Sequence, residues 1–258
     1  MSGFAGVWNI DGRPLDRELI AALESKVAHR GERHAHLWCV DGFGCAARVR
    51  RVGARSLDER QPLTDPEGNA LVFDGRLDNR DDLLRQLRGT RLTSDSPDAA
   101  LVFEAFREWG DACLERLSGD FALATFRADE RRLVLARDPV GCRPLYYWFD
   151  GKACVFASEI KAILAHPDVR AEPNHDLLAD FVLRDHLPYE DEGETFFRGV
   201  HAVLPGYQLS LSSRGIVSRQ SSSPARESRA FGVRVTAAQR AVFMAAGVAV
   251  ALLNWRPL

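Results

Sequence analysis

Residues 121–157 read FALATFRADERRLVLARDPVGCRPLYYWFDGKACVFA, and this stretch decides the class of fold. It contains short runs in which apolar residues alternate with polar or small ones, a pattern typical of strands with one buried face. The runs are Phe121–Phe126, Arg132–Ala136, Leu145–Phe149 and Cys154–Ala157. Turn-forming pairs such as Ala128-Asp129 and Asp150-Gly151 separate them. Strands this close together in sequence pair as hairpins, so the stretch predicts antiparallel sheet.

Similar runs flank this stretch on both sides and predict further strands at Phe4–Ile10, His36–Val40, Ala70–Phe73 and Gln208–Leu211. Apolar residues at helical spacing lie between the strands, and we interpret them as core faces of helices. These are Leu19, Leu23 and Val27 after a cap at Asp16; Leu83, Leu84 and Leu87; Val102, Phe106 and Trp109 after Pro97; and Asn174–Leu183, capped by Asn174. Few helices among many antiparallel strands predict an α+β fold with two sheets layered between helices.

Composition excludes several classes of function. Of the 258 residues, 46% are apolar and 27% are charged, as in an ordinary globular domain with a sizeable core. The net charge of −2 gives no electrostatic reason to expect nucleic acid or a membrane as a partner. No basic stretch followed by an apolar core opens the chain, so we expect a cytoplasmic protein. The five cysteines lack Cys-x-x-Cys spacing, which favours buried free thiols over a zinc site or a disulfide framework.

The character of the sequence changes near residue 219. The stretch Ser218–Pro224 has the composition of a linker, and an Ala- and Arg-rich segment follows it. Residues 241–253 form an uncharged run of 13, shorter than the roughly 20 residues that a membrane span requires. We therefore predict a domain at residues 1–219 and an atypical tail at 220–258. A truncated gene, a change of reading frame and a genuine short paralogue are the alternatives for that tail.

The N-terminus offers a candidate for nucleophilic chemistry. Ser2 follows the initiator methionine directly, and a small residue there is expected to allow Met1 to be removed. The freed α-amine has an ordinary pKa of about 7.7–8.0, close to operating pH, so it can act as a base toward its own side-chain oxygen. Most proteins with serine at this position do not use it, so this feature alone decides nothing.

Several blocks along the chain, taken in order, resemble one family. They are Met1–Gly6, Ala28–Gly31, Phe73–Asn79, Pro97-Asp98, Arg116–Ala122, Ala136–Gly141, Arg143–Tyr147 and Phe156–Ala162. The opening resembles that of class II glutamine amidotransferases, and the later blocks resemble asparagine synthetase and its relatives, which include β-lactam synthetases and lasso-peptide cyclases. The resemblance covers residues 2–219. It implies an N-terminal-nucleophile αββα sandwich and the ammonia-producing half of an ATP-dependent, amide-forming enzyme.

The resemblance also implies the residues of the site. Ser2 stands where the family has its nucleophilic cysteine, and a hydroxyl must lose its proton during attack. Asp74 stands where the family has an oxyanion-stabilising asparagine, whereas Gly75 keeps a backbone donor. Either Arg48 or Arg50 is the candidate for binding glutamine, the other being a surface strand residue.

Asp98 matches a family aspartate that holds the substrate amine, although it could equally cap a helix. The departures at Ser2 and Asp74 predict a degraded glutaminase site.

The other half of such an enzyme carries a Ser-Gly-Gly-x-Asp-Ser loop that cradles pyrophosphate, and this sequence has none. ATP and magnesium are therefore expected only in a separate synthetase domain, and this chain is expected to bind no cofactor or metal itself.

Three readings stay open: a glutaminase that supplies ammonia, a non-catalytic scaffold for an amide-forming synthetase, and a defective gene product. The sequence of residues 74–79, Asp-Gly-Arg-Leu-Asp-Asn, resembles the lasso-cyclase branch more than it resembles housekeeping asparagine synthetases. Glutamine and an ATP-binding synthetase are the expected partners, and a homodimer is a second assembly to consider.

Overall fold

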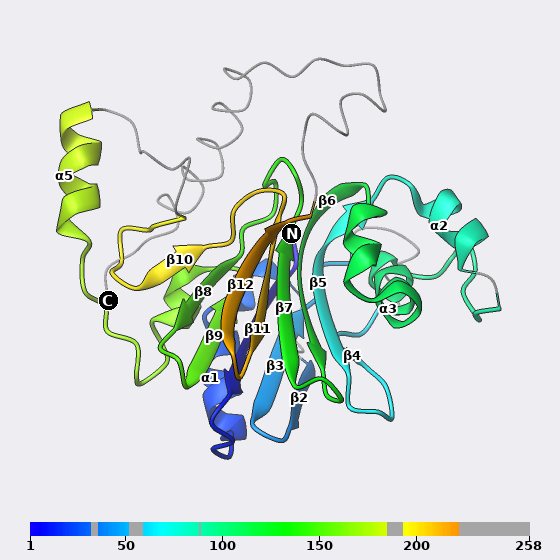
Figure 1. Ribbon diagram of the computed structural model, residues 1–258, viewed down its shortest axis with the longest axis horizontal. Helices are drawn as coiled ribbons and strands as arrows, with labels where there is room; N and C mark the ends of the chain where they lie inside the picture. Colours follow the sequence, from blue (N-terminus) through cyan, green and yellow to red (C-terminus); the bar gives the residue numbers. More distant parts are fainter. Residues whose placement is uncertain (32–35, 52–58, 88, 185–192, 222–258) are drawn as a thin grey trace.

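The fold is built on two antiparallel sheets of six strands each. The computed structural model describes residues 1–31, 36–51, 59–87, 89–184 and 193–221. Figure 1 shows the two sheets stacked at the centre of the molecule, with helices on both outer sides. The α+β sandwich predicted from the sequence is therefore confirmed. The tail at residues 222–258, including the uncharged run at 241–253, lies outside the described residues.

The first sheet contains the N-terminal strand. Its order is β10-β8-β9-β1-β3-β2, and every neighbouring pair is antiparallel. The strands are β1 (Gly3–Asn9), β2 (His36–Val40), β3 (Phe43–Arg48), β8 (Tyr146–Phe149), β9 (Ala153–Ala157) and β10 (Val200–Ala202). β1 lies between β3 and β9, so the residue that precedes it is held near the middle of the sheet, at one end of the strands.

The second sheet has the order β12-β11-β7-β6-β5-β4 and is also fully antiparallel. Its strands are β4 (Leu63–Thr64), β5 (Ala70–Leu77), β6 (Gly119–Arg127), β7 (Arg132–Arg137), β11 (Tyr207–Ser212) and β12 (Gly215–Gln220). β5 is longer than the predicted Ala70–Phe73, because its pairing with β6 continues through Asp74 and Gly75 to Leu77.

Helices cover the outer faces of both sheets. They are α1 (Arg17–Ser25), α2 (Arg80–Gln86), α3 (Asp98–Trp109) and α4 (Ile160–Ile163), with short 3₁₀ turns at Ala28–Arg30 and Gly110–Glu115. Helix α5 (His175–Arg184) stands to one side of the sheets (Figure 1). α1 and α4 pack on β1 and β9 through one apolar cluster, whereas α2 and α3 pack on β5 and β6 through another. The predicted cap at Asp16 is confirmed, since its side chain accepts a hydrogen bond from the Glu18 N–H. Among the described residues, no helix is long and apolar enough to cross a membrane.

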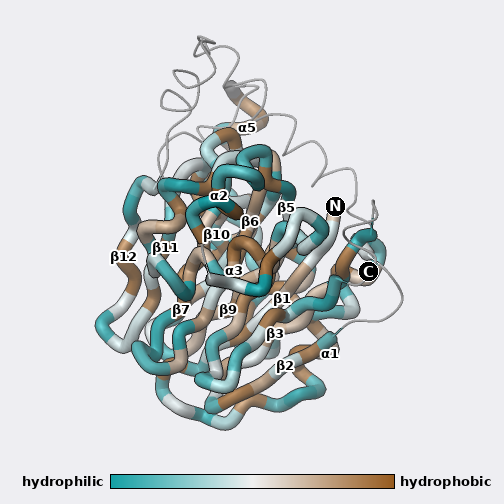
Figure 2. The backbone as a smooth tube through the Cα atoms, turned by 90° about the vertical axis from the view of Figure 1, so that its right-hand side faces the viewer, coloured by the Kyte–Doolittle hydropathy of each residue, from teal (hydrophilic) through white to brown (hydrophobic). Residues whose placement is uncertain are grey.

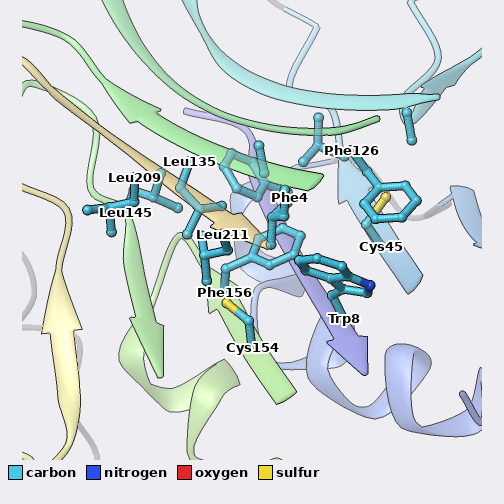
Figure 3. Close-up of a cluster of buried hydrophobic side chains, with 14 of the residues drawn as sticks. Phe4, Trp8, Cys45, Phe126, Leu135, Leu145, Cys154, Phe156, Leu209 and Leu211 are labelled. Carbon is cyan, nitrogen blue, oxygen red and sulfur yellow. The ribbon is translucent and has the colours of Figure 1, made fainter. Parts of the chain in front are cut away.

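A third apolar cluster fills the space between the sheets. Phe4 and Trp8 of β1 contribute to it, with Phe156 of β9 and, from the second sheet, Phe126 of β6 (Figure 3). Phe43 of β3 belongs to the same cluster. Phe43 and Phe126 stack across the two sheets with their ring centroids 4.3 Å apart. Hydrophilic residues are concentrated in the loops and turns that connect the strands (Figure 2). Burial of large aromatic side chains between the sheets fixes how the two strand sets face each other.

Two local expectations differ from the structure. Ser218–Gln220, which have the composition of a linker, complete strand β12 by pairing with β11. β12 is an edge strand with an exposed face, so its polar composition carries no sign of the pairing. Of the cysteines, Cys45, Cys113 and Cys154 are buried as free thiols, whereas Cys39 is half-buried and Cys142 is exposed.

Candidate active site

Ser2 and Asp74 meet where the two sheets face each other. Alternate residues of a strand share a face, and Phe4 of β1 and Val72 of β5 both point into the core between the sheets. Ser2 lies two positions before Phe4 and Asp74 two positions after Val72, so both face the same space. The Ser2 backbone N–H donates a hydrogen bond of 2.8 Å to Asp74 Oδ1 across 72 positions of the sequence. The Asp74 carboxylate is buried, with only 2% of the residue exposed.

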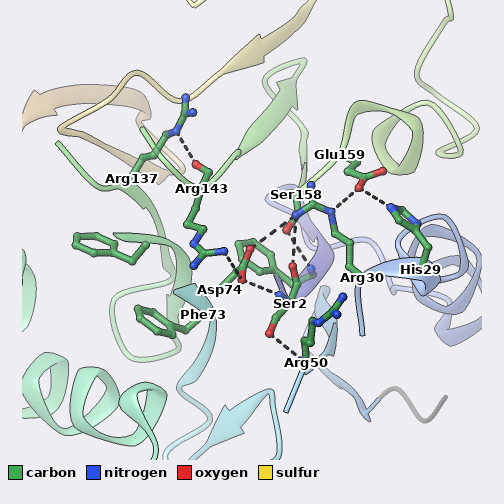
Figure 4. A network of polar contacts seen from close by, with 12 residues as sticks. Ser2, His29, Arg30, Arg50, Phe73, Asp74, Arg137, Arg143, Ser158 and Glu159 are labelled. Carbon is green, nitrogen blue, oxygen red and sulfur yellow. Dashed lines mark hydrogen bonds and ion pairs between the residues drawn. The ribbon is translucent and has the colours of Figure 1, made fainter. Parts of the chain in front are cut away.

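Two arginines flank this carboxylate. Arg30 Nη1 lies 3.7 Å from Asp74 Oδ2, and Arg143 Nη1 lies 3.9 Å from Asp74 Oδ1 (Figure 4). Asp74 Oδ2 is buried and accepts no hydrogen bond within the described part of the chain. Burial raises the pKa of the Asp74 carboxyl, and the guanidinium groups of Arg143 and Arg30 oppose that shift. The site is therefore a buried carboxyl group whose burial favours the neutral form and whose two neighbouring cations oppose that shift.

Arg30 connects Asp74 to a second carboxylate. The Arg30 Nε donates to Glu159 Oε1, and His29 Nε2 lies 2.8 Å from the same oxygen. Lys161 Nζ lies 2.9 Å from Glu159 Oε2. Burial raises the pKa of Glu159, but hydrogen bonds and charge from Arg30 and Lys161 outweigh it and hold that pKa below its usual range. Arg30, with 7% of its side chain exposed, is thus fixed between two acidic groups.

The loop that carries Arg143 is held by its own charged residues. Asp138 is fully buried and accepts hydrogen bonds from the backbone N–H groups of Phe121, Val140, Gly141, Cys142 and Arg143, at 2.6–3.3 Å. Arg137 donates from the other side to the carbonyl oxygens of Arg143, Gly141 and Val203, at 2.6–3.0 Å. These contacts satisfy polar groups that a tight buried loop would otherwise leave unpaired, and they fix the position from which Arg143 reaches Asp74.

Gly75 follows Asp74 in β5 and lies against β6. A Cβ atom at this position would come within 2.4 Å of the Asp120 carbonyl oxygen and 2.7 Å of the Phe121 Cβ. Any side chain at residue 75 would therefore force the two strands apart. This close approach fixes the main chain of the Asp74-Gly75 segment beside Ser2.

The candidates for glutamine binding are placed differently from one another. The Arg50 backbone N–H donates a hydrogen bond of 3.0 Å to Ser2 Oγ, and its exposed side chain lies beside Ser2 in Figure 4. Arg48 instead pairs with Glu24 beneath helix α1. The Asp98 carboxylate accepts a 2.8 Å hydrogen bond from the Leu77 N–H and pairs with Arg80. Asp98 is the first residue of α3 rather than its cap, which is Pro97.

The structure thus brings Ser2, Asp74, Gly75 and Arg50 together, and it engages Arg48 and Asp98 in contacts with other residues. Sequence reasoning assigned no role to Arg30, Arg143 or Glu159, although all three lie in the blocks that carry the family resemblance. Nothing in the sequence indicates that Arg30 and Glu159, which lie 129 positions apart, form an ion pair. In the described part of the chain, no group of three or more His, Cys, Asp or Glu side chains is arranged to hold a metal ion.

Comparison with known proteins agrees with this geometry. A family model described as a glutamine amidotransferase domain matches residues 1–221. Asparagine synthetase [glutamine-hydrolyzing] 3 of Bacillus subtilis (strain 168) is 32% identical over 162 residues, which cover 61% of this chain and 26% of that protein. Asparagine synthetase [glutamine-hydrolyzing] 1 of the same organism is 29% identical over 228 residues, covering 83% of this chain and 34% of that protein. This chain therefore spans only about a quarter to a third of these relatives' length.

Solved structures support the fold. The glutamine phosphoribosylpyrophosphate amidotransferase of B. subtilis, in complex with ADP and GMP, superimposes with a TM-score of 0.60 at 21% identity. The superposition covers 85% of this chain and 49% of the other. The family match over residues 1–221 and the two paired antiparallel sheets define the class. The chain belongs to the glutamine amidotransferase domain family, in the form found in asparagine synthetases.

Proposed function

We propose that this chain is a glutamine amidotransferase-type domain of an asparagine-synthetase-like, amide-forming protein, and that it hydrolyses glutamine weakly or not at all. The observation that carries the proposal is the buried carboxylate of Asp74, hydrogen-bonded to the Ser2 N–H and flanked by Arg30 and Arg143. Those contacts place an aspartate where the family resemblance implies the side-chain donor that amide hydrolysis needs.

Electrostatics makes this substitution worse than the loss of one contact. Attack on the glutamine side-chain amide creates a negative oxygen, and removing a single donor to such an oxygen typically lowers kcat by about 10²–10³. An ionised aspartate accepts hydrogen bonds but cannot donate them, and it repels the developing charge. A protonated Asp74 could donate, and its raised pKa works in that direction. Arg30 and Arg143 oppose this shift, but burial outweighs them. In either protonation state Asp74 donates fewer hydrogen bonds than the two that an asparagine NH₂ group offers, which supports the reading of a weak or lost activity.

The position of Ser2 supports a retained framework without efficient chemistry. Ser2 Oγ accepts a hydrogen bond from the Arg50 N–H, so the hydroxyl is fixed at the same end of the sheets as Asp74. A hydroxyl still needs a base to take its proton during attack, whereas a thiol is partly ionised at neutral pH. Serine at this position therefore adds to the loss that Asp74 imposes.

The domain would then act as a scaffold for the rest of an amide-forming enzyme. The two relatives are named as glutamine-hydrolysing asparagine synthetases. This chain covers 26% of one and 34% of the other. We propose that ATP and Mg²⁺ are bound by a synthetase domain or partner outside residues 1–221. The residues of this chain do not include the pyrophosphate-binding loop that such a domain needs, so no step of nucleotide chemistry is assigned to them. Homodimer formation is a further proposal for the same domain.

The test is glutamate release from glutamine by the purified full chain and by three variants: Ser2→Cys, Asp74→Asn and the double change. We expect no turnover above background for the unmodified chain. We expect at least about a 10²-fold gain in the double variant relative to Ser2→Cys alone, because the introduced asparagine side chain would restore one donor. Circular dichroism and thermal unfolding of each variant check that it is folded. Clear turnover by the unmodified chain would refute the proposal.

Binding of an ATP-dependent partner is tested separately. Co-purification of the chain with the ATP-dependent domain of an asparagine synthetase, followed by ATP–pyrophosphate exchange, measures whether the two form one enzyme. Failure to associate would remove the scaffold reading while leaving the glutaminase result unchanged.

A further inference from the structure

The main-chain nitrogen of Ser2, which would become the N-terminal amine if Met1 were removed, donates its hydrogen bond to a carboxylate. It lies 2.8 Å from Asp74 Oδ1, which is well within hydrogen-bond distance of a buried carboxylate. In the full chain this nitrogen is an amide. Hydrolysis of the Met1–Ser2 peptide bond by a methionine aminopeptidase would convert it into an α-amine, which is charged when protonated.

We propose that, in the chain that begins at Ser2, the α-ammonium group and the Asp74 carboxylate form a buried ion pair that holds the amine protonated. The pair would change the role of the terminus from a base to a structural anchor. A base must be neutral to accept the proton of the Ser2 hydroxyl, so an amine held in its charged form cannot assist attack. This inference deepens the proposed loss of glutaminase activity and rests on it for its functional meaning, but its physical content can be measured separately.

The charges around the amine act in both directions. Arg30, from the 3₁₀ turn after α1, Arg143, from the loop before β8, and Arg50, after β3, oppose a positive terminus. Asp74 favours it. In the full chain, burial lowers the pKa of the Met1 amine, and the Asp74 charge already acts against that shift.

One residue further into the site, the amine of Ser2 would touch the carboxylate directly. Arg30 Nη1 approaches Asp74 to 3.7 Å and Arg143 Nη1 to 3.9 Å, both longer than the 2.8 Å contact of Ser2. Coulomb energy falls with distance, and a charge-assisted hydrogen bond adds to it, so of these three groups the Ser2 amine would interact most strongly with Asp74.

Two other carboxylates complete the surroundings. Glu159 pairs with Arg30 and thereby reduces the positive charge that Arg30 presents to the terminus. Glu59, on the segment before β4, is close enough to Asp74 for each charge to disfavour the other, and burial raises the pKa of Glu59. Burial raises the pKa of Asp74 as well, so the hydrogen-bonded contact with the Ser2 nitrogen, and not the titration of either carboxyl group, identifies Asp74 as the partner of the new amine.

The ion pair has a defined pH signature. An amine whose pKa is higher in the folded state than in the unfolded state stabilises the fold fully below its unfolded pKa, about 7.7–8.0. That contribution is lost as the pH rises through the folded pKa. Removal of Met1 should therefore stabilise the protein at neutral pH and cease to do so in alkaline solution.

The experiment compares two forms of the full chain released from one cleavable fusion, one beginning at Ser2 and the other at Met1. Intact mass confirms each terminus. In ¹³C-serine-labelled protein, the Ser2 Cα and Cβ signals, assigned by their absence from Ser2→Ala protein, are followed from pH 6 to pH 10.5. We expect a titration midpoint above about 8 in the Ser2-terminated form. We expect a lower midpoint in its Asp74→Asn variant. Equal midpoints in the two proteins, or a wild-type midpoint at or below the reference range, would overturn the inference.

A second measurement covers the case in which Asp74→Asn does not fold. Thermal unfolding of the Ser2- and Met1-terminated wild-type forms is compared at pH 7 and pH 10.5. A higher Tm for the Ser2-terminated form at pH 7, with the difference diminished at pH 10.5, supports the ion pair. An equal or lower Tm at pH 7 contradicts it. Glutamate release on the same samples tests the proposed function independently, because active protein with a raised midpoint would refute only the loss of activity.

Discussion

Arg48 and Glu24 form an ion pair on the outer face of β3, where the Arg48 Nε and Nη2 atoms donate to separate oxygens of the Glu24 carboxylate. Arg48 follows the alternation of Ala46, which packs against α1 in the outer core, and not that of Cys45 and Ala47, which face the other sheet. Arg48 is therefore directed to the helix layer, where its role is structural, while Arg50 contacts Ser2 through its backbone.

The first prediction concerns this pair. Arg48→Ala leaves Glu24, which is 6% exposed, without its cation, and we expect a loss of about 3 kcal/mol in the free energy of unfolding. Arg50→Ala, at an exposed position, should change stability by no more than about 0.5 kcal/mol. Urea unfolding of both variants measures the difference. Equal losses would show that the Arg48–Glu24 pair is not a stabilising contact.

The second prediction concerns Arg30, the cation between Asp74 and Glu159. Arg30→Met keeps much of the side-chain volume but removes the one cation that two largely buried carboxylates share, so we expect a loss of about 3 kcal/mol in the free energy of unfolding. Lys161→Met is the matched control, because Lys161 also contacts Glu159 but is 40% exposed in its side chain. Its loss should stay below about 1 kcal/mol. Similar values for the two variants would contradict the central position of Arg30.

The third prediction is a dependence of stability on acid. The pKa of Glu159 is lower in the folded state than its usual value, so its ionised form stabilises the fold above the unfolded pKa of about 4.3. This contribution is lost as the pH falls through the lower, folded pKa. The stability advantage of wild type over Glu159→Gln should therefore be largest near neutrality and decrease toward pH 3. Denaturant unfolding across that range measures it, and a difference that does not change with pH would count against the assignment.

The fourth prediction concerns the loop that carries Arg143. Asp138→Asn replaces one acceptor oxygen by an NH₂ group that faces backbone donors, so we expect a loss of about 3 kcal/mol. Asp129→Asn is the control, since the Asp129 side chain is 63% exposed. A crystal structure of Asp138→Asn should show Arg143 displaced from Asp74. An unmoved Arg143 in a fully stable variant would show that the loop does not depend on Asp138.

The layered fold was predictable because its strands are local in sequence. The hairpin of β6 and β7 and that of β8 and β9 each alternate cleanly and turn within a few residues, so the chain segment itself records the pairing. β3 was missed because Gly44 and its small neighbours lack that alternation. The structure explains the glycine, since a Cβ there would come within 2.5 Å of a Leu15 methyl carbon. Close packing beneath α1, rather than local propensity, selects these residues.

The site was predictable only in part. The resemblance placed Ser2 beside the Asp74-Gly75 segment, and the structure brings these residues together. The resemblance gave no means to choose between Arg48 and Arg50. Which side of the sheet each side chain faces depends on where strand β3 ends, and that is at Arg48. The contacts of Arg30 with Glu159 and Asp74 join distant segments and follow from the packing of α1 and β9 against β1. Such contacts are set by tertiary structure and leave no spacing in the sequence.

The contacts of Asp138 bear on how relatives of this chain should be recognised. The segment around Arg137 and Asp138 is among the strongest marks of kinship in the sequence, yet these two side chains bind main-chain groups of their own loop and of neighbouring strands. The loop would need these two side chains even in a relative that had lost all catalytic activity. A genome survey that relies on this segment will therefore collect active and inactive domains alike, and under the proposed function the residues at positions 2 and 74 are those expected to separate them.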